Sequence, residues 1–389
     1  MLRSLRDLDV ARRRVLVRVD YNVPLKDGRI TDDTRLRESL PTLEYLLARH
    51  AKIILVSHLG RPEGKVVPEL RLDPIAQRLQ ELLRRPVTKL NDCIGPSVQS
   101  AIAQMQPGDI VLLENVRFYP QEEANDEDFA RELARLADCY VNDAFGTAHR
   151  AHASTYGVAK FLPSAAGLLL EREVTMLSRA TENPARPFIA LVGGAKLKEK
   201  IGVLNDLMGK VDAFLLGGAV AFTLLKAQGA HVGDSLVDET MLDEARAYLQ
   251  GVREQGPELV LPVDVQIVRG SERALAPADA IPDGWQGRDI GPQTIQLFQD
   301  WVKRAKTILW AGPLGRFEEP PFDAGTRAIA HAIAESQAFA IVGGGETAAA
   351  LSHAGLTHAQ NIYCSTGGGA ALEFIGGRKL LPIEILKKS

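Results

Sequence analysis

The segment VLVRVDYNV (residues 15–23) has the composition of a buried β-strand, with β-branched and apolar residues in near-continuous succession before the polar Asp20 and Asn22. Longer segments with helical spacing, such as 73–85 and 126–137, follow runs of this kind. Apolar strands that alternate with amphipathic helices are typical of parallel sheets covered on both faces. We therefore predict an α/β fold. Nine further runs share the pattern: KIILVSHLG (52–60), DIVLLENVR (109–117), CYVNDAFG (139–146), FIALVGG (188–194), AFLLGG (213–218), ELVLPVDV (258–265), TILWAGP (307–313), AFAIVGGG (338–345) and NIYCSTGGG (361–369).

The length of 389 residues predicts two domains, each large enough to bury its own core. A helical run over 165–181 is followed by the segment ENPARP (182–187), whose two prolines stop the helix before the next strand. We place the boundary there and predict two Rossmann-like lobes, each a parallel sheet flanked by helices, joined by a hinge helix. The expected parts are a first lobe (1–170), an interdomain helix and linker (171–187), a second lobe (188–375) and a C-terminal segment (376–389) that could return to the first lobe.

The charge, the first residues and the cysteines of the chain argue against several classes of protein. With 46 Lys+Arg against 49 Asp+Glu the net charge is −3, which gives no reason to expect binding to nucleic acid or to a membrane surface. The start MLRSLRDLDVARRR lacks the apolar stretch of a secretory signal, so we expect a cytoplasmic protein. Cys93, Cys139 and Cys364 match neither a disulfide framework nor a metal site, and we expect buried thiols.

Polar and basic residues follow the strands of the first half. Ligands of open parallel sheets bind beyond the carboxyl ends of the strands, so these residues are candidates for one site. Guanidinium groups grip phosphate or carboxylate in pairs of hydrogen bonds and keep their charge, which predicts a site for a compact polyanion. The alternative for any single arginine is an ordinary solvated side chain. The candidates are Asp20, Asn22, Arg35, His58, Arg61, Arg117, His149, Arg150 and His152.

The strand ends of the second half are rich in glycine instead, for example GGAKLKEK (193–200), GGGET (343–347) and STGGGAALE (365–373). Glycine lets backbone amides approach phosphate oxygens, and a helix that starts directly afterwards adds its positive end. We expect a nucleotide-phosphate site, with Lys196 and Lys200 on one face of a helix that opens after Gly194. Neither a P-loop nor a dinucleotide fingerprint occurs in the chain.

From end to end the chain resembles the phosphoglycerate kinase family. The motifs that carry the resemblance are VLVRVDYNVP (15–24), SHLGRP (57–62), LLENVRF (112–118), NDAFGTAHRAH (142–152), GGAKLKEKI (193–201), GWQGRDIGP (284–292), GPLGRFE (312–318) and STGGGAALE (365–373). The resemblance implies a hinge-bending, glycolytic kinase that transfers a phosphoryl group between 1,3-bisphosphoglycerate and ADP, giving 3-phosphoglycerate and ATP, with Mg²⁺. It also implies small-molecule substrates alone, and a monomer as the default state.

The resemblance assigns roles to individual residues. Substrate binding falls to Asp20, Asn22, Arg35, His58, Arg61, Arg117 and Arg150. Nucleotide binding falls to Lys200, Gly287, Glu318, Gly344, Gly345, Glu346 and Thr347, with Glu346 as the candidate Mg²⁺ ligand. Stabilisation of the transferring group falls to Arg35, Lys196 and the backbone amides around Gly367, Gly368 and Gly369.

The second half departs from the family pattern at several positions. Ala311 stands where asparagine is usual, Arg316 where an apolar residue is usual, and Ala219 within a usual triple glycine. Glu199 and Glu346 stand where aspartate is usual. We therefore expect a weaker or less selective ADP site. Two alternatives stay open, namely a related acyl-phosphate kinase and a catalytically weakened homologue that only binds its ligands; a bilobal solute receptor would need a signal peptide.

Overall fold

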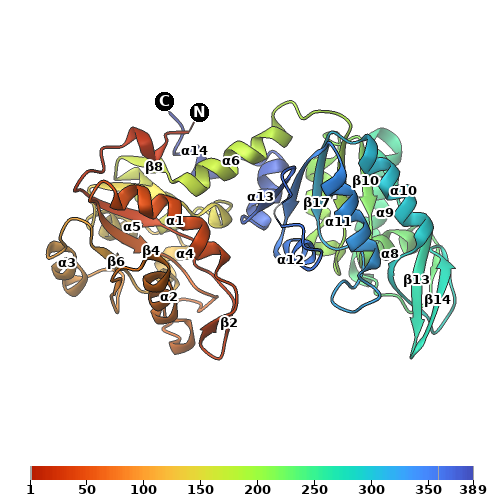
Figure 1. Cartoon of the computed structure of the whole chain (residues 1–389), viewed down its shortest axis with the longest axis horizontal. Coiled ribbons are helices and arrows are strands. Elements are labelled where there is room, and N and C mark those ends of the chain that lie inside the picture. Colours follow the sequence, from red (N-terminus) through yellow and green to blue (C-terminus); the bar gives the residue numbers. More distant parts are fainter. Residues whose placement is uncertain (1, 358, 389) are drawn as a thin grey trace. The chain divides into compact units, whose positions relative to one another are not determined.

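The computed structural model describes residues 2–357 and 359–388, without the side chain of Gln255. The chain forms two compact units (Figure 1). Unit 1 comprises the chain up to Thr175 and again from Lys379 onward, and unit 2 comprises Met176–Arg378. The boundary between them falls inside one helix, α6 (Leu168–Thr181).

Unit 1 is built on a six-stranded sheet with the order β5-β6-β4-β1-β7-β8, in which every neighbouring pair is parallel. β1 occupies a central position because the chain first builds outward on one side of it and then returns to add β7 and β8 on the other. The strands are β1 (Arg14–Arg18), β4 (Lys52–Val56), β5 (Thr88–Lys89), β6 (Ile110–Leu112), β7 (Cys139–Asn142) and β8 (Ser164–Ala166).

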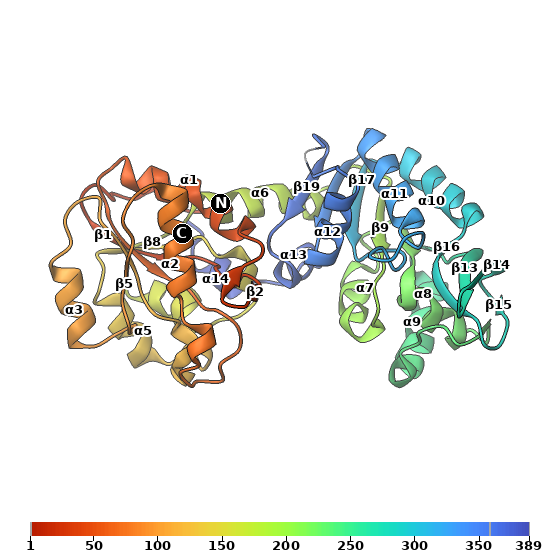
Figure 2. The ribbon, with the colours of Figure 1, turned by 60° about the horizontal axis from the view of Figure 1, so that its bottom comes forward.

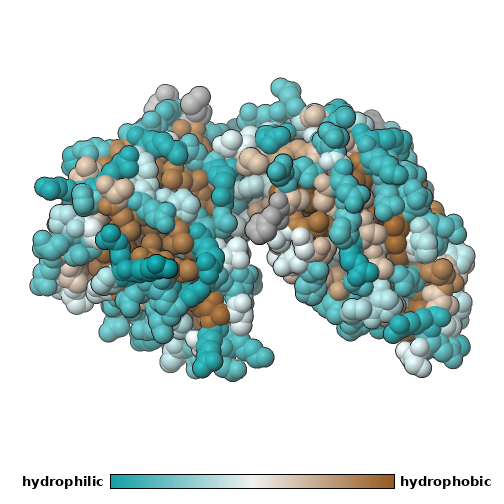
Figure 3. Space-filling model, viewed as in Figure 1, coloured by the Kyte–Doolittle hydropathy of each residue, from teal (hydrophilic) through white to brown (hydrophobic). Residues whose placement is uncertain are grey.

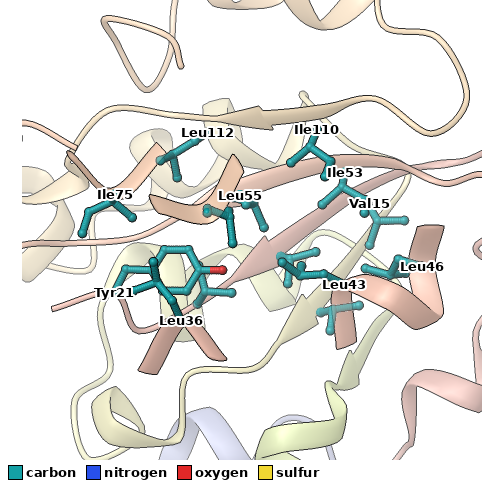
Figure 4. Packing of buried hydrophobic residues seen from close by; sticks show 14 of the residues in the cluster. Val15, Tyr21, Leu36, Leu43, Leu46, Ile53, Leu55, Ile75, Ile110 and Leu112 are labelled. Carbon is teal, nitrogen blue, oxygen red and sulfur yellow. The ribbon is translucent and has the colours of Figure 1, made fainter. Parts of the chain in front are cut away.

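Alternate residues of these strands enter two separate cores, as the period of two in a strand requires. Val15 and Val17 of β1 pack on one face with Leu36 and Leu43, while Leu16 between them joins the core on the opposite face. Figure 4 shows the first of these cores, where side chains of the sheet meet those of α1 and α2. Burial on both faces explains the near-continuous apolar runs in the sequence.

The helices of unit 1 start and stop at recognisable residues. Pro96 opens α3 and Pro120 opens α4, positions where the missing N–H costs no helical hydrogen bond. The carboxylate of Asp126 accepts the N–H of Phe129 at 2.8 Å and caps α5. The helices are α1 (Thr34–Leu47), α2 (Asp73–Leu83), α3 (Pro96–Ala103), α4 (Pro120–Glu123), α5 (Glu127–Ala134) and α14 (Leu381–Glu384), and a short hairpin joins β2 (Leu25–Lys26) to β3 (Arg29–Ile30).

Both ends of the described chain lie in unit 1, as the two labels in Figure 1 indicate. Leu2 forms an antiparallel bridge with Lys387, and the ammonium of Lys388 lies 2.9 Å from the carboxylate of Asp7. The chain thus leaves unit 1 once, through α6, and returns to it after Arg378.

The prediction of a helix from residue 165 is wrong for its first three positions. Ala165 and Ala166 pair with β7 as part of β8, and the N–H of Gly167 bonds to the carbonyl of Asn142. The helix begins only at Leu168, where the buried carboxylate of Asp143 accepts the N–H groups of Leu169 and Leu170 at 2.9 and 3.2 Å. Ala165 and Ala166 are compatible with a helix, but pairing with β7 keeps them in the sheet. The carboxylate of Asp143 then sets the start of α6.

Unit 2 repeats the architecture with the strand order β12-β10-β9-β17-β18-β19, again with all pairs parallel. The α/β prediction with two parallel sheets is thus confirmed. The strands are β9 (Phe188–Val192), β10 (Ala213–Leu216), β12 (Glu258–Val260), β17 (Thr307–Ala311), β18 (Phe339–Gly343) and β19 (Ile362–Ser365). The helices are α7 (Ile201–Leu207), α8 (Gly218–Ala227), α9 (Leu242–Gln255), α10 (Pro292–Arg304), α11 (Ala324–Glu335), α12 (Gly345–His353) and α13 (Gly369–Ile375).

Unit 2 carries an addition that the sequence patterns did not predict. The run 258–265 divides at Pro262, which cannot donate to a ladder, into β12 of the main sheet and the start of β13 in a separate antiparallel sheet. This sheet has the order β14-β13-β16, and Figure 2 shows it beside α8. Its core is Phe222 and Leu225 of α8 with Val265 and Ile267 of β13. The strands are β13 (Asp264–Arg269), β14 (Glu272–Pro277) and β16 (Gln286–Ile290), with the pair β11 (His231–Val232) and β15 (Ala280–Ile281) nearby.

The surface of each unit mixes polar and apolar side chains. On the face shown in Figure 3, hydrophobic residues are visible between hydrophilic ones in both units. Among the described residues, none of the helices combines the length and the apolar character that a membrane span requires.

Cys93 and Cys139 are buried thiols, as predicted, whereas Cys364 is only half-buried.

Candidate functional site: a basic pocket and a glycine-lined pocket

Unit 1 has a pocket of about 220 Å³ where the loops after β1, β4, β6 and β7 converge. β1 and β7 lie side by side, although the chain visits β4, β5 and β6 between them, so the pocket sits where the direction of strand addition reverses. Such points are the usual ligand sites of open parallel sheets. The lining residues are Asp20, Asn22, Arg35, His58, Gly60, Arg61, Arg117, Gly146, Thr147, His149 and Arg150.

Hydrogen bonds tie these loops to one another. The carboxylate of Asp20 accepts the Nη1 of Arg35 at 2.7 Å, which joins the end of β1 to the first turn of α1. The side-chain oxygen of Asn22 accepts the N–H of Gly60 at 2.8 Å, and the Nη1 of Arg117 donates to the carbonyl of the same glycine at 2.8 Å. The pocket walls are therefore held in place by the fold itself, before any ligand binds.

The charge in this pocket is strongly positive. Four lining side chains are arginine and one, Asp20, is a carboxylate. His58 adds no charge, because burial and the nearby guanidinium groups lower its pKa well below the ordinary value. Burial likewise lowers the pKa of His152, close by, to about 4. Asp20 pairs with Arg35, and Arg117 lies 3.3 Å from the carboxylate of Glu123 outside the lining. A small pocket lined by four arginines and one carboxylate suits a compact ligand with several negative charges.

Unit 2 has a larger pocket of about 390 Å³ beyond the carboxyl ends of β9, β10, β17 and β18. It too lies at the reversal point of its sheet, because β9 and β17 are neighbours although the chain places β10 and β12 between them. Its walls are Gly194, Ala195, Gly218, Ala219, Phe222, Leu236, Gly287, Arg288, Pro313, Gly315, Arg316, Glu318 and Glu346.

Glycines allow the loops after β9 and β17 to approach each other closely on the floor of this pocket. The N–H of Gly193 bonds to the carbonyl of Ala311 at 3.1 Å, and the N–H of Gly194 bonds to that of Pro313 at 2.9 Å. Gly194 has a φ of +106°. Gly287 lies against the ring of Phe222, so closely that a Cβ there would come within 2.1 Å of the ring. Gly194 is thus required by its positive φ and Gly287 by close approach, and both leave space for a flat ligand group.

Polar side chains gather at the mouth of the same pocket. Arg316 is half-exposed and lies 3.0 Å from the carboxylate of Glu319, and its N–H bonds to the carbonyl of Arg288. Glu318 and Glu346 are exposed carboxylates. Within the part of the chain that the structure describes, no cluster of three or more metal-ligating side chains occurs. A cation held here would therefore need oxygen ligands from a bound molecule as well.

The seven predicted substrate residues all line the pocket of unit 1. Of the predicted nucleotide residues, Gly287, Glu318 and Glu346 line the pocket of unit 2. The side chain of Lys200 lies beside Gly194, at the edge of this pocket. Thr347 is buried behind Glu346, while Gly344 and Gly345 form the bend that opens α12. Lys196, Gly367 and Gly368 lie outside the lining residues.

One expectation about unit 2 is corrected, and a second loses part of its basis. No α-helix opens directly after Gly194, because Lys196 has an extended backbone and a single 3₁₀ turn over Leu197–Glu199 precedes α7. Lys196 and Lys200 therefore do not share one helical face. Ala311 is fully buried and does not line the pocket, so its position gives no direct support to the idea that it weakens the ADP site.

Several residues that line the two pockets were not predicted from the sequence. Phe222 stands four residues after Gly218, one turn into α8, but an apolar helical residue there is equally expected in a core. Leu236 lies far from any glycine motif quoted above and gave no signal. Arg288 lies within the motif GWQGRDIGP and could have been noticed as a charged residue directly after the candidate Gly287. Gly60 and Thr147 likewise lie within quoted motifs of unit 1.

Comparison with known proteins gives a consistent result. The family model described as phosphoglycerate kinase matches residues 5–378. The phosphoglycerate kinase of Pelotomaculum thermopropionicum is 51% identical over 388 residues (99% of this chain, 98% of the relative), and that of Dictyoglomus turgidum is 53% identical over 389 residues (99% and 98%).

Two solved structures are similar along their whole length. The phosphoglycerate kinase of Coxiella burnetii has a TM-score of 0.88 at 41% identity and covers 99% of both chains. That of Pyrococcus horikoshii has a TM-score of 0.87 at 32% identity, with 99% of this chain and 98% of that one covered. With a family model over nearly its full length and relatives at half identity, this chain belongs to the phosphoglycerate kinase family.

Proposed function

We propose that this chain catalyses the reaction of its family, the reversible transfer of a phosphoryl group from 1,3-bisphosphoglycerate to ADP, giving 3-phosphoglycerate and ATP in glycolysis and gluconeogenesis (EC 2.7.2.3). The pocket of unit 1 would hold the glycerate and the pocket of unit 2 the nucleotide. One observation carries this assignment: all seven residues that match the family's substrate motif line a single pocket, although they come from five separate segments of the chain.

The pocket of unit 1 suits 3-phosphoglycerate, whose phosphate and carboxylate together carry several negative charges. Arg61, Arg117 and Arg150 would bind these anionic groups, because guanidinium matches both phosphate and carboxylate. Asp20 is already paired with Arg35 and would hold that guanidinium in its direction. Asn22 would add a polar contact from the loop after β1.

The pocket of unit 2 suits a nucleotide, with an apolar wall of Phe222 and Leu236 and glycine backbone opposite. Glu318 would accept hydrogen bonds from the ribose, and Lys200 with the amides at Gly344 and Gly345 would face phosphates. The residues present also fit Mg²⁺, because Glu346 offers an exposed carboxylate at the pocket and this ion usually takes one or two carboxylates plus phosphate oxygens. Bound there, the ion would neutralise charge on the phosphates.

The transfer itself needs no covalent enzyme intermediate. An oxygen of the nucleotide's terminal phosphate forms the new bond to phosphorus, and the bond between phosphorus and the acyl oxygen breaks, which leaves the glycerate carboxylate. Negative charge on the transferring group has to be stabilised during this step. Arg35 and Lys196, helped by backbone amides around Gly367 and Gly368, would supply that stabilisation.

Because the two pockets belong to different units, the reaction requires the units to approach and to exclude water from the acyl phosphate. We propose that α6 and the segment after Gly377 act as the hinge. The protein would work as a cytoplasmic monomer. Small-angle scattering should show smaller dimensions when both substrates are present, and unchanged dimensions would contradict the hinge.

A coupled assay that supplies 3-phosphoglycerate and ATP and follows ADP formation tests the function. We expect turnover that depends on Mg²⁺ and is abolished by Arg35→Ala. A related acyl-phosphate kinase would prefer another carboxylate substrate, and a binding-only homologue would bind both ligands by calorimetry without turnover. Glu346→Gln should raise the Mg²⁺ concentration needed for half-maximal rate, while Glu335→Gln, on α11, serves as a control.

A further inference from the structure

An arginine that lines neither pocket lies directly beneath the pocket of unit 1. Arg18 ends β1 and is only 1% exposed, in a strand whose other residues are mostly apolar. A guanidinium group keeps its charge even when buried, and a buried charge is tolerated only where it is paired and hydrogen-bonded. The partners of Arg18 therefore indicate what it does.

Each nitrogen of this guanidinium has a partner. Its Nε donates to the hydroxyl of Ser154 at 2.8 Å, and its Nη1 donates to the carbonyl of Val19. Its Nη2 lies 3.1 Å from the Nδ1 of His58. The hydroxyl of Ser154 donates in turn to one carboxylate oxygen of the buried Glu122 at 2.6 Å, and the N–H of Ser154 donates to the other at 2.9 Å. Arg18 is thus linked to a carboxylate through one hydroxyl.

The contact with His58 fixes the protonation of the imidazole. Arginine has only donors, so the Nδ1 of His58 has to accept and cannot carry a proton. The proton of the neutral ring is then on Nε2. Since Arg18 does not line the pocket whereas His58 does, the ring edge that remains for a ligand is the one with Nε2–H.

We propose that Arg18 is a positioning residue that holds His58 as the neutral Nε2–H tautomer, so that His58 contributes one donated hydrogen bond to the ligand and no positive charge. The proposal rests on the proposed function of this pocket as the glycerate site. In this proposal His58 recognises the ligand by a hydrogen bond, whereas the arginines around it recognise the ligand by charge.

The groups around His58 act in the same direction. Arg18 of β1, Arg35 of α1, Arg117 after β6 and His152 after β7 all disfavour a cationic imidazole, and burial does so most strongly. His58 is 3% exposed. Burial and these cations thus lower the pKa of His58 and favour the neutral ring, whose unprotonated Nδ1 can accept from Arg18.

The proposal is tested first by nitrogen NMR of the full chain labelled at histidine, with the His58 signals assigned by their loss in His58→Gln. We expect an unprotonated Nδ1 and a protonated Nε2 from pH 8 down to pH 5. A protonated Nδ1, or titration near pH 6.5, the ordinary value for histidine, would overturn the proposal.

Variants then separate positioning from mere support of the fold. In Arg18→Met, His58 should titrate closer to pH 6.5 and populate both tautomers. The KM for 3-phosphoglycerate should rise about tenfold at pH 8, as expected for one lost hydrogen bond, and less at pH 6, where a cationic ring attracts the anion. Arg14→Met is the matched control, because Arg14 begins the same strand but pairs with Asp138 at 2.6 Å. An unchanged tautomer in Arg18→Met would refute the positioning role.

If Arg18→Met does not fold, Ser154→Ala replaces it, since this change removes the acceptor that orients the Nε of Arg18. The tautomer of the wild-type protein is measured without any substrate, so it stays informative if the proposed reaction fails. A wild-type protein with the expected tautomer, whose His58→Gln variant keeps its KM, would show that the pocket is used differently and would contradict the proposed glycerate site. The expected tautomer together with a raised KM in His58→Gln supports both the positioning role of Arg18 and the proposed glycerate site.

Discussion

The hydroxyl of Thr347 accepts the backbone N–H of Gly312 at 2.7 Å and donates to the carbonyl of Gly343 at 3.1 Å. This buried side chain thereby joins the first turn of α12 to the loop that follows β17, and both segments contribute walls to the pocket of unit 2. The pocket geometry depends on this link between two glycine-rich loops, since glycine itself supplies no side chain to hold them together.

Thr347→Val should loosen this link with almost no change in volume. The N–H of Gly312 would lose its partner inside the protein, which costs about 1–3 kcal/mol of stability. We expect a lower melting temperature and a higher KM for ADP, with an unchanged KM for 3-phosphoglycerate. Thr347→Ser keeps the hydroxyl and serves as the control. Equal ADP constants in Thr347→Val and the wild type would contradict the link.

Gly287→Ala should impair nucleotide binding through a clash. The added Cβ would lie 2.1 Å from the ring of Phe222, so the ring or the strand has to move into the pocket. Overpacking of this kind costs about 1–3 kcal/mol. If about 1.4 kcal/mol of this cost falls on the nucleotide-bound state, the Kd for ADP rises about tenfold. Calorimetry with ADP and with 3-phosphoglycerate separately measures the effect in each pocket.

The matched control for this change is Gly251→Ala in α9. A Cβ at Gly251 would meet Met208 only at ordinary contact distances of 3.7 Å and beyond. Alanine is also the better helix former by up to about 1 kcal/mol, so this variant should be as stable as the wild type or slightly more stable. If both variants weaken ADP binding equally, the clash with Phe222 is not the cause.

The sequence predicted the fold well where strands are long and buried on both faces. All ten apolar runs contain a strand of one of the two parallel sheets, because such strands need continuous apolar residues. The sequence did not reveal β5 and β8, because these edge strands of two and three residues are too short to show the residue pattern of a strand. It also failed at Pro262, where one apparent run belongs to two different sheets.

The candidate site was predictable to the extent that its residues follow strands. Strand ends meet at one edge of a parallel sheet, which is why the arginines of unit 1 could be placed together before any coordinates. Arg18 also stands at the end of a strand, but its side chain is buried and does not line the pocket, so its role depends on a contact with His58 that only the folded chain shows. The sequence signal for a residue such as Arg18 is a charged side chain in an otherwise apolar strand, because a buried charge needs a partner.

Lys196→Ala should lower turnover without loss of stability. Its side chain is 68% exposed and its ammonium lies 3.9 Å from the carboxylate of Glu199, so its removal costs the fold almost nothing. If it stabilises the transferring phosphoryl group, kcat should fall by about 10²–10³ while both KM values stay close to the wild-type values. Lys198→Ala, an exposed lysine two residues away, should retain full activity. A fall in ADP affinity with unchanged kcat would assign Lys196 to binding instead.

Asp289→Asn should change how the stability of unit 2 depends on pH. Asp289 is 2% exposed and accepts the N–H groups of Gly325 at 2.7 Å and Ile290 at 2.9 Å. Burial raises its pKa from 3.8 to about 7. Between these values the folded state keeps a proton that the unfolded state has lost, so this residue makes the protein less stable as the pH rises from about 4 to about 7.

An asparagine has no proton to lose and should remove this dependence, so the difference in stability between variant and wild type should change by on the order of 2–4 kcal/mol across the interval. Urea unfolding followed by tryptophan fluorescence measures it selectively, because the three tryptophans, Trp285, Trp301 and Trp310, all belong to unit 2. Asp300→Asn, at a half-exposed position on α10, is the control. Parallel pH profiles for Asp289→Asn and the wild type would show that the buried carboxyl does not titrate in this range.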